Sequence, residues 1–304
     1  LGDADEVNIY NTDPTNSDSD GDGFTELAEV AAGTDPSDEW VGIPEDDFFV
    51  VLPYEGPEAR DNLRFSTDIE IADVFFLVDT TGSMGDTISD VASSLSGTIV
   101  PGIQATIPNA WIGVGRFEDF PVGGYGDSGT HGGIPGLPAD DVPFFLHSVV
   151  RDPAIYLAEI QAAVDQLRNI GSGDDVPESH PEGLYQTATG EGIDPWVPAQ
   201  TCEEMPDQVS PPVGYPCFRP GALPIVVLIT DAVMHNGPGG ANSYGSGIPG
   251  GGHTVDQAVD ALNAIGARVI GVGSEPMGDA LSHLDYVATA TGTVDESGAP
   301  LVYS

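Results

Sequence analysis

Three oxygen-bearing side chains follow one apolar run of the chain at a spacing of two residues. The run is Val74 to Val78, and behind it come Asp79, Thr81 and Ser83. Carboxylate and hydroxyl oxygens are hard ligands that suit Mg²⁺, Mn²⁺ or Ca²⁺ and disfavour zinc and copper. The stretch therefore predicts a divalent-cation site. The alternative is a strand-to-helix turn in which Asp79 or Ser83 only caps the next helix.

Alternating apolar segments predict the elements that position this turn. We expect strands at 73–79, 111–117, 143–150, 224–230 and 267–272, and helices near 84–97, 153–169, 183–190, 254–265 and 278–291. Such alternation predicts an α/β fold, in which a doubly wound, mainly parallel sheet carries helices on both faces. Ligands of these sheets bind at the carboxyl ends of the strands, where Asp79 is expected.

More acidic side chains are expected at the same edge of the sheet. Asp231 follows the fourth predicted strand and offers a second carboxylate opposite Asp79. Glu118 and Asp119 follow the second predicted strand, and residues 171–178 form a glycine- and acid-rich loop before a helix. Because parallel strands end at one edge, we expect these carboxylates to converge on a cation.

These segments together resemble a known class of adhesion domain. The turn after Val78 resembles the metal-ion-dependent adhesion site (MIDAS) of von Willebrand factor A (vWA) domains. The wider set resembles the I-like domain of integrin β subunits over nearly all of residues 69–304. The matching segments are Asp79 to Asp86, Phe117 to Asp119, Asp175 to Glu178 with Gln186, and Thr230 to Ala232 with His235. The resemblance implies a vWA/Rossmann-like fold and a role in cell adhesion.

The resemblance also implies a row of metal sites. The central adhesion site would hold Mg²⁺ or Mn²⁺ on Asp79, Thr81, Ser83, Glu178 and Asp231. The flanking sites would hold Ca²⁺, one on Asp119, Asp175, the carbonyl of Pro177 and Glu178, and the other on the carbonyl of Ser83 and on Asp86.

Three positions depart from the integrin-like pattern. Thr87 stands where the family has a second acid, and Gly173 stands where it has an asparagine ligand. The pair Pro181-Glu182 offers a competing register for the ligand at 178. We favour Glu178 because its spacing to Gln186 fits the family and because it follows the acidic loop.

The expected activity is recognition of a protein partner. Mg²⁺ keeps several water ligands, and an Asp or Glu carboxylate of a partner can replace one of them. Catalysis is not expected, because the histidines show no metal-ligand spacing and Thr81 stands where a nucleophile elbow around Ser83 needs glycine. The alternatives are a structural subunit that self-assembles at the cell surface and uses metals only for folding, and a metal-dependent hydrolase using Glu178 and Asp231.

The N-terminal segment contains a second kind of metal motif. It satisfies D-x-D-x-D-G-x5-E, whose predicted Ca²⁺ ligands are Asp18, Asp20, Asp22, Phe24, Glu26 and Glu29. A second, partial copy precedes it at a period of about 23 residues. The run resembles thrombospondin type 3 calcium repeats. We therefore expect a calcium-bound repeat at 1–40, a linker with a strand near 48–52 at 41–68, and the vWA-like domain at 69–304.

Composition restricts the setting of the protein. The 304 residues include 49 acids against 7 basic residues, all of them arginine, for a net charge of -42. This charge excludes nucleic acid and anionic membrane surfaces as partners. No apolar run approaches the ~20 residues of a membrane span, so direct membrane insertion is not expected. A disulfide between Cys202 and Cys217 would imply an extracellular or cell-surface location, and free thiols are the alternative.

Overall fold

The structure is a computed structural model that describes residues 1–38, 40, 71–202, 211–245 and 247–304. The chain divides into two compact units, Leu1–Asp68 and Ile69–Ser304. The linker predicted at 41–68, including its strand near 48–52, lies outside the described residues. None of the helices in the described ranges has the length and apolarity needed to span a membrane.

The larger unit is built on a six-stranded sheet with the strand order β3-β2-β1-β4-β5-β6. The strands are β1 Ile71–Asp79, β2 Asn109–Phe117, β3 Phe145–Arg151, β4 Leu223–Thr230, β5 Arg268–Gly273 and β6 Val302–Tyr303. Neighbouring strands pair in parallel except β2 and β3, which pair antiparallel. The mainly parallel α/β sheet predicted from the sequence is confirmed; β6 was not predicted.

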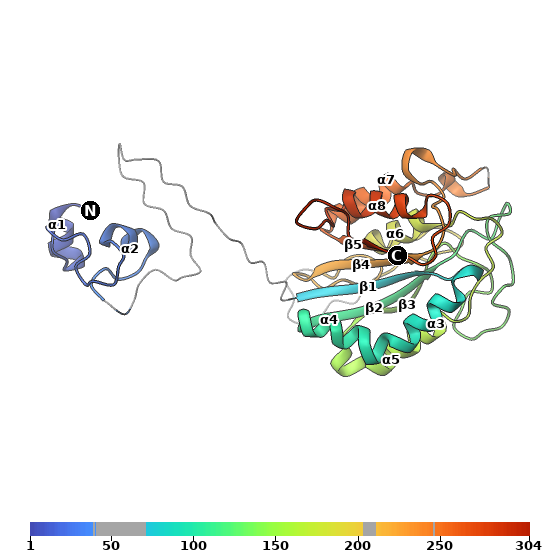
Figure 1. Cartoon of the computed structure of the whole chain (residues 1–304), viewed down its shortest axis with the longest axis horizontal. Helices are drawn as coiled ribbons and strands as arrows, with labels where there is room; N and C mark the ends of the chain where they lie inside the picture. The colour runs from blue at the N-terminus through green and yellow to red at the C-terminus, as the bar shows by residue number, and fades with distance from the viewer. Residues whose placement is uncertain (39, 41–70, 203–210, 246) are drawn as a thin grey trace. The chain divides into compact units, whose positions relative to one another are not determined.

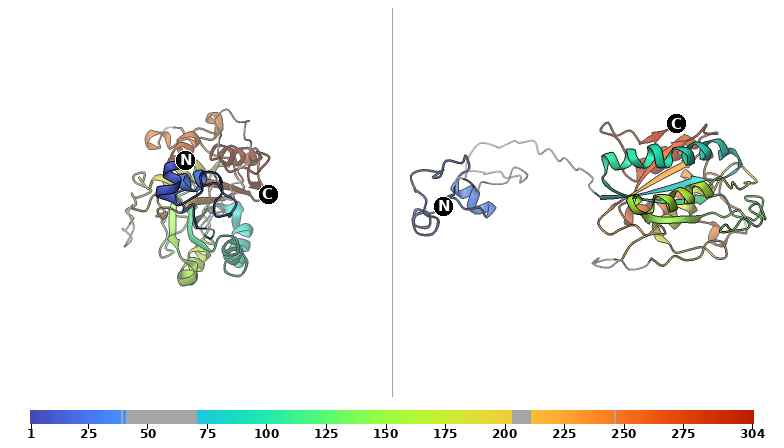
Figure 2. Two further views of the ribbon diagram at one scale, coloured as in Figure 1. Left: turned by 90° about the vertical axis from the view of Figure 1, so that its left-hand side faces the viewer. Right: turned by 90° about the horizontal axis from the view of Figure 1, so that it is seen from below.

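Helices cover both faces of this sheet, with α3, α4 and α5 on one side and α6, α7 and α8 on the other (Figures 1 and 2). The helical segments of this unit are η2 Gly82–Met84, α3 Gly85–Ser94, η3 Leu95–Ile99, α4 Val100–Thr106, α5 Pro153–Gln166, α6 His180–Thr189, η4 Pro238–Gly240, η5 Pro249–Gly251, α7 Val255–Ala264 and α8 Ala280–Ala290. Local signals start several of them. Asp152 accepts a hydrogen bond from the N–H of Ala154 at the start of α5, and Thr254 forms a capping box with Gln257 at the start of α7.

The central strand β1 is buried on both faces because its side chains alternate between two cores. Phe75 and Leu77 belong to the core under α6, α7 and α8. Val74, Phe76 and Val78 belong to the core under α3, α4 and α5. A strand covered on both faces has a continuous apolar sequence, and this is the pattern of the residues that precede Asp79. Elsewhere in this unit, Cys202 and Cys217 form the predicted disulfide.

The smaller unit contains α1 Asp3–Asp5, η1 Glu6–Tyr10 and α2 Glu26–Ala32. Its two copies of the repeat end their helices in the same way. Gly33 caps α2 in the left-handed conformation and its N–H bonds the carbonyl of Glu29, while Asn11 caps η1 likewise and bonds the carbonyl of Glu6. The first copy has one more residue between glutamate and cap, and a π-helical turn absorbs it.

Candidate metal centre at the carboxyl ends of the strands

Parallel register brings the predicted acidic side chains to one edge of the sheet. Asp79, the last residue of β1, is in register with Phe117, the last residue of β2. Val78 is likewise in register with Ile229 of β4. Asp119 lies two residues beyond the end of β2 and Asp231 directly follows β4, so the three aspartates lie at the same edge, as expected.

Asp79 is fully buried and is held by hydroxyl groups. Its Oδ1 accepts hydrogen bonds from the Thr81 N–H at 3.0 Å and the Thr81 hydroxyl at 2.7 Å. Its Oδ2 accepts from the Thr230 hydroxyl at 2.7 Å. Burial raises the pKa of the Asp79 carboxyl to about 6, although these hydrogen bonds favour its ionised form. The negative charge of Asp231 raises this pKa further.

Glu178 is pinned beside this carboxylate through its backbone. It pairs with Met234 in a parallel bridge, donating its N–H to the Val233 carbonyl at 2.9 Å and accepting from the His235 N–H at 2.9 Å. Its side chain is 3% exposed, and within the described part of the chain its Oε2 has no hydrogen-bond partner. Burial raises the pKa of the Glu178 carboxyl well above its ordinary value, and the charge of Asp79 adds to the effect.

Gly173 brings a loop backbone against both Glu178 and Thr81. A Cβ at this position would lie 2.7 Å from Glu178 Oε1 and 3.3 Å from Thr81 Cγ2, and its φ of +62° is in the left-handed region. Glycine is therefore required here for two separate reasons. The departure from the asparagine of the integrin-like pattern is explained, because a side chain would displace Glu178.

Asp231, like Glu178, has a carboxylate oxygen that accepts no hydrogen bond from the described residues. It is 5% exposed, and no described residue donates a hydrogen bond to its Oδ1. Ser83 in η2 and Asp86 in the first turn of α3, in contrast, are exposed. Next to Asp86, the Thr87 hydroxyl is hydrogen-bonded to Ser274. The metal roles predicted for Ser83 and Asp86 stay predictions.

The competing register at Glu182 is disfavoured by its contacts. Its Oε1 accepts a hydrogen bond from Gln186 at 2.8 Å, and its Oε2 lies 2.8 Å from His253 Nδ1. Both carboxylate oxygens of Glu182 are therefore hydrogen-bonded, one to a residue of α6 and the other to the loop before α7. Glu178, in contrast, has one carboxylate oxygen without a hydrogen-bond partner among the described residues.

Asp119 and Asp175, which were predicted to flank the centre, come together around His235. Asp119 Oδ2 lies 3.4 Å from His235 Nε2, and Asp175 Oδ2 lies 3.2 Å from the same nitrogen. Burial raises the pKa of both carboxyls, that of Asp119 well above its ordinary value. Pro177, whose carbonyl was predicted as a ligand, is half-buried next to Glu178. The sequence expected His235 beside the site but not in contact with both acids.

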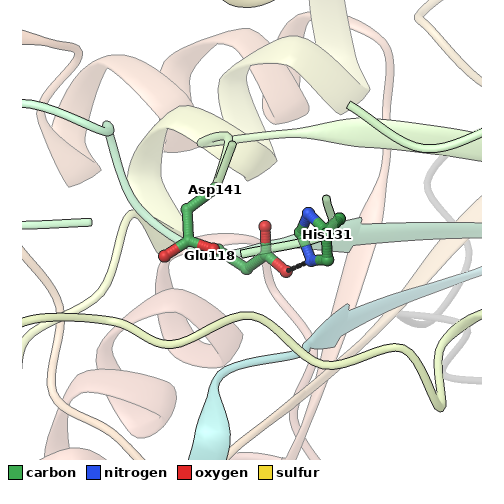
Figure 3. A group of neighbouring side chains, drawn as sticks. All are labelled: Glu118, His131 and Asp141. Atoms are coloured by element: carbon green, nitrogen blue, oxygen red, sulfur yellow. Dashed lines mark ion pairs between the residues drawn. The ribbon is translucent and has the colours of Figure 1, made fainter. Parts of the chain in front are cut away.

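Glu118, His131 and Asp141 form a separate buried cluster (Figure 3). Glu118 bonds the Arg116 guanidinium and the Thr80 hydroxyl, and it lies 3.1 Å from His131 Nε2. Asp141 accepts a hydrogen bond from the Thr130 hydroxyl at 2.6 Å and from the Gly173 N–H at 3.2 Å. Because Arg116 supplies the balancing charge, this cluster supports the metal-centre loops without needing an ion.

His180 is a further residue that the sequence did not single out. It is fully buried, with Nε2 2.8 Å from the Thr230 hydroxyl and Nδ1 3.0 Å from the Glu178 carbonyl. Burial lowers the pKa of its imidazole to about 3, so the ring is neutral at ordinary pH. His180 thus lies against the Thr230 side chain, whose hydroxyl donates to Asp79. The only available signal was its position one helical turn before Leu184 on the buried face of α6.

The N-terminal loop gathers its predicted carboxylates in the smaller unit. Oxygens of Asp18, Asp20 and Asp22 lie within 4.8 Å of one another. In the described ranges, Asp20 Oδ2 and Glu29 Oε1 have no hydrogen-bond partner. Burial raises the pKa of Glu29 to about 7, and the charges of neighbouring acids contribute.

Glu26 and Phe24 are the two remaining predicted ligands of this loop. Glu26 accepts a hydrogen bond from the Ser19 N–H at 2.7 Å through its Oε1. Phe24, whose carbonyl was predicted as a ligand, follows Gly23, which has a φ of +102° and makes the sharp turn. The predicted ligands fit Ca²⁺, because all of them are oxygen atoms and two of these oxygens accept no hydrogen bond from the described residues.

Comparison with known proteins identifies the N-terminal segment. Residues 1–17 and 18–39 match the family Bacterial TSP3 repeat, which confirms the repeat part of the predicted organisation. A comparison with curated proteins gives no match.

Solved structures that match this chain at low identity include a pilus adhesin and a mussel protein. The pilus adhesin SpaC from Lactobacillus rhamnosus GG, in its open conformation, is 14% identical with a TM-score of 0.44, over 78% of this chain and 28% of that one. A second SpaC structure is 15% identical with a TM-score of 0.40, over 75% and 27%. Proximal thread matrix protein 1 from the mussel byssus is 14% identical with a TM-score of 0.35, over 77% and 43%. The chain spans less than half the length of each.

Proposed function

We propose that residues 69–304 form a vWA domain of integrin β I-like type that recognises a protein partner through a metal ion. The central ion, Mg²⁺ or Mn²⁺, would be held by Asp79, Thr81, Ser83, Glu178 and Asp231. The partner would present an Asp or Glu carboxylate to this ion. Recognition, and not catalysis, is the proposed activity, at an extracellular or cell-surface location.

One observation carries the proposal: Glu178 Oε2 and Asp231 Oδ1 are buried without a donor from the described residues, beside the fully buried Asp79. Burying an uncompensated carboxylate costs several kcal/mol. A divalent cation between these oxygens would offset that cost and return the carboxyls to their ionised forms. Carboxylate and hydroxyl donors are the set that Mg²⁺ and Mn²⁺ prefer.

The exposure of Ser83 gives the proposed ion an open side. Asp79, Glu178 and Asp231 are buried, whereas Ser83, in η2, is exposed. An ion bound between them would therefore keep water on its Ser83 side, as Mg²⁺ usually does. A carboxylate of a partner could replace that water and complete the charge and the geometry together.

The contacts of the nearby histidine argue against acid–base catalysis. Both ring nitrogens of His180 lie within hydrogen-bond distance of Thr230 or Glu178, and the ring is fully buried. A group in this position can orient ligands but cannot exchange a proton with a substrate. The TSP3 repeats and the disulfide favour an extracellular setting, in which calcium would stabilise the N-terminal loop.

Water relaxation of bound Mn²⁺ tests the proposal without a known partner. A paramagnetic ion such as Mn²⁺ that carries an exchangeable water shortens the proton relaxation time of the solvent. An aspartate-containing peptide that replaces this water should lengthen the relaxation time again. We expect this behaviour in the full chain and its loss in Asp79→Asn. The matched control is Asp90→Asn, which changes an exposed acid on α3.

Other outcomes would assign a different role. If Asp79→Asn lowers the melting temperature of the Mn²⁺-loaded protein while the peptide has no effect on relaxation in the wild type, the metal serves folding alone. Mn²⁺-dependent turnover of p-nitrophenyl phosphate that is lost in Asp79→Asn would indicate a hydrolase. Either result would overturn the recognition proposal.

A further inference from the structure

His235 lies between two carboxylates at distances that suit a shared metal ion. Its Nε2 is 3.4 Å from Asp119 Oδ2 and 3.2 Å from Asp175 Oδ2. Charge-assisted N–H···O bonds are shorter, about 2.7–2.9 Å. Ligand atoms that each lie about 2.0–2.2 Å from one ion, at tetrahedral or octahedral angles, are about 2.8–3.6 Å apart. The observed spacing therefore fits ligands of a common ion better than an ion pair.

The other ring nitrogen of His235 determines where the proton sits. Its Nδ1 is 2.6 Å from the backbone carbonyl of Asn242. A carbonyl oxygen can only accept, so Nδ1 carries a hydrogen. In the neutral ring, Nε2 then presents a lone pair to the two carboxylates, which is repulsive unless a cation lies between them. Metal-ligating histidines show the same arrangement, in which the second nitrogen donates to a carbonyl.

Asp119 supplies an independent sign of a missing positive charge. Its side chain is fully buried, and its Oδ1 accepts hydrogen bonds from the Phe120 N–H and the Tyr244 hydroxyl, each at 2.6 Å. Its Oδ2, which faces His235, has no hydrogen-bond donor among the residues that the structure describes. One oxygen is thus fixed for orientation while the other is left available for a ligand.

Two tyrosines hold the imidazole in place. The Tyr244 ring stacks on His235 with the ring centres 4.1 Å apart, and the Tyr125 ring meets His235 edge-on at 5.1 Å. Tyr125 also accepts a hydrogen bond from the Gly245 N–H at 2.6 Å, which joins the two long loops that carry these rings. A ligand restrained by packing and by a second hydrogen bond is preorganised for metal binding.

We infer that Asp119, Asp175 and His235 form a metal site selective for Zn²⁺ over Ca²⁺. Imidazole nitrogen suits first-row transition ions, whereas Ca²⁺ takes six to eight oxygen ligands. Three protein ligands leave a coordination position for water. The inference replaces the all-oxygen calcium site expected at this flank. It does not depend on whether the Asp79 centre binds a partner.

A competition titration tests the metal preference directly. The full chain, freed of metal by a chelator, is titrated with Zn²⁺ against a chromophoric chelator in the presence of excess Ca²⁺. We expect His235→Asn to weaken Zn²⁺ binding at least about 100-fold, since even the loss of an outer hydrogen bond to a ligand weakens binding 10–100-fold. Ca²⁺ binding should not change. The matched control, His253→Asn, alters the histidine that lies against Glu182 and should bind Zn²⁺ as the wild type does.

A measurement on the wild-type protein keeps the inference testable if His235→Asn fails to fold. Anomalous diffraction at the zinc edge should show an ion about 2.0–2.2 Å from His235 Nε2. No peak there at saturating Zn²⁺ would overturn the inference. So would equal Zn²⁺ affinity in the wild type and a folded His235→Asn.

Discussion

Replacing Gly173 by alanine should weaken metal binding at the proposed centre through a single added methyl group. The new Cβ would lie 2.7 Å from Glu178 Oε1, where ordinary contacts begin at 3.4 Å. The difference, 3.4 − 2.7 = 0.7 Å, is the distance by which the Glu178 carboxylate or the loop must move. Binding sites need their ligands placed within about 0.5 Å, so we expect Mn²⁺ affinity to fall at least about tenfold, or ~1.4 kcal/mol.

The substitution also strains the backbone, and a second glycine provides the control. Gly173 has a φ of +62°, and Gly221, before β4, has a φ of +80° with open space, free of other atoms to 4 Å, where a Cβ would lie. Alanine in this region costs about 1–2 kcal/mol. Gly173→Ala and Gly221→Ala should therefore lose similar stability in chelator, while only Gly173→Ala loses Mn²⁺ affinity.

The assay is a Mn²⁺ titration of each variant followed by electron paramagnetic resonance, paired with urea denaturation in chelator. Wild-type Mn²⁺ affinity in Gly173→Ala would refute the reasoning that Glu178 belongs to the metal centre. Weaker binding in both would show that the strain, and not the contact with Glu178, governs affinity.

Two further predictions concern other parts of the chain. Near the start of β1, Arg219 Nε donates a hydrogen bond to the buried Asp73 Oδ1 at 2.7 Å. Arg219→Met leaves the Asp73 carboxylate buried without its counter-charge, so it should lower the free energy of unfolding in urea by about 3–5 kcal/mol. Mn²⁺ affinity should not change, and a shift in affinity would contradict this prediction. In the calcium-free repeat, burial raises the pKa of Glu29 to about 7, so protonated Glu29 adds stability at low pH that is lost as the pH rises through 7. Calcium must displace that proton, so calcium affinity, measured with a calcium electrode, should fall as the pH is lowered below 7, approaching about tenfold per pH unit near pH 6. In Glu29→Gln the affinity should not depend on pH over this range. A flat profile in the wild type would contradict the prediction.

The parts of the fold that were predicted from the sequence depend on local patterns. The run Val74 to Val78 is apolar on both faces because both faces are covered, so its type and its end at Asp79 could be predicted. The TSP3 repeats and the disulfide were also predicted, because ligand spacing and a cysteine pair are visible in one dimension. The short strand β6 was missed because a two-residue pairing has no periodicity to detect.

The parts that were not predicted depend on contacts between distant segments. His235 meets Asp119 and Asp175 only because two glycine-rich loops, which have no regular pattern, fold over the same strand ends. The pairing of Arg116 with Glu118 was also missed, although the two residues project to one face at a spacing of two. The need for glycine at 173 follows from the position of Glu178, which no local pattern shows.

The π-helical turn of the first repeat shows how such repeats accommodate changes in length. Glu6 and Glu29 each bond the left-handed cap of their helix, at Asn11 and Gly33, although the first copy has one more residue between the two points. The inserted residue therefore changes the pitch of one helical turn, while the glutamate and the left-handed cap residue keep their hydrogen bond in both copies. Profiles that search for further copies of this unit should let the glutamate-to-cap distance vary by one residue.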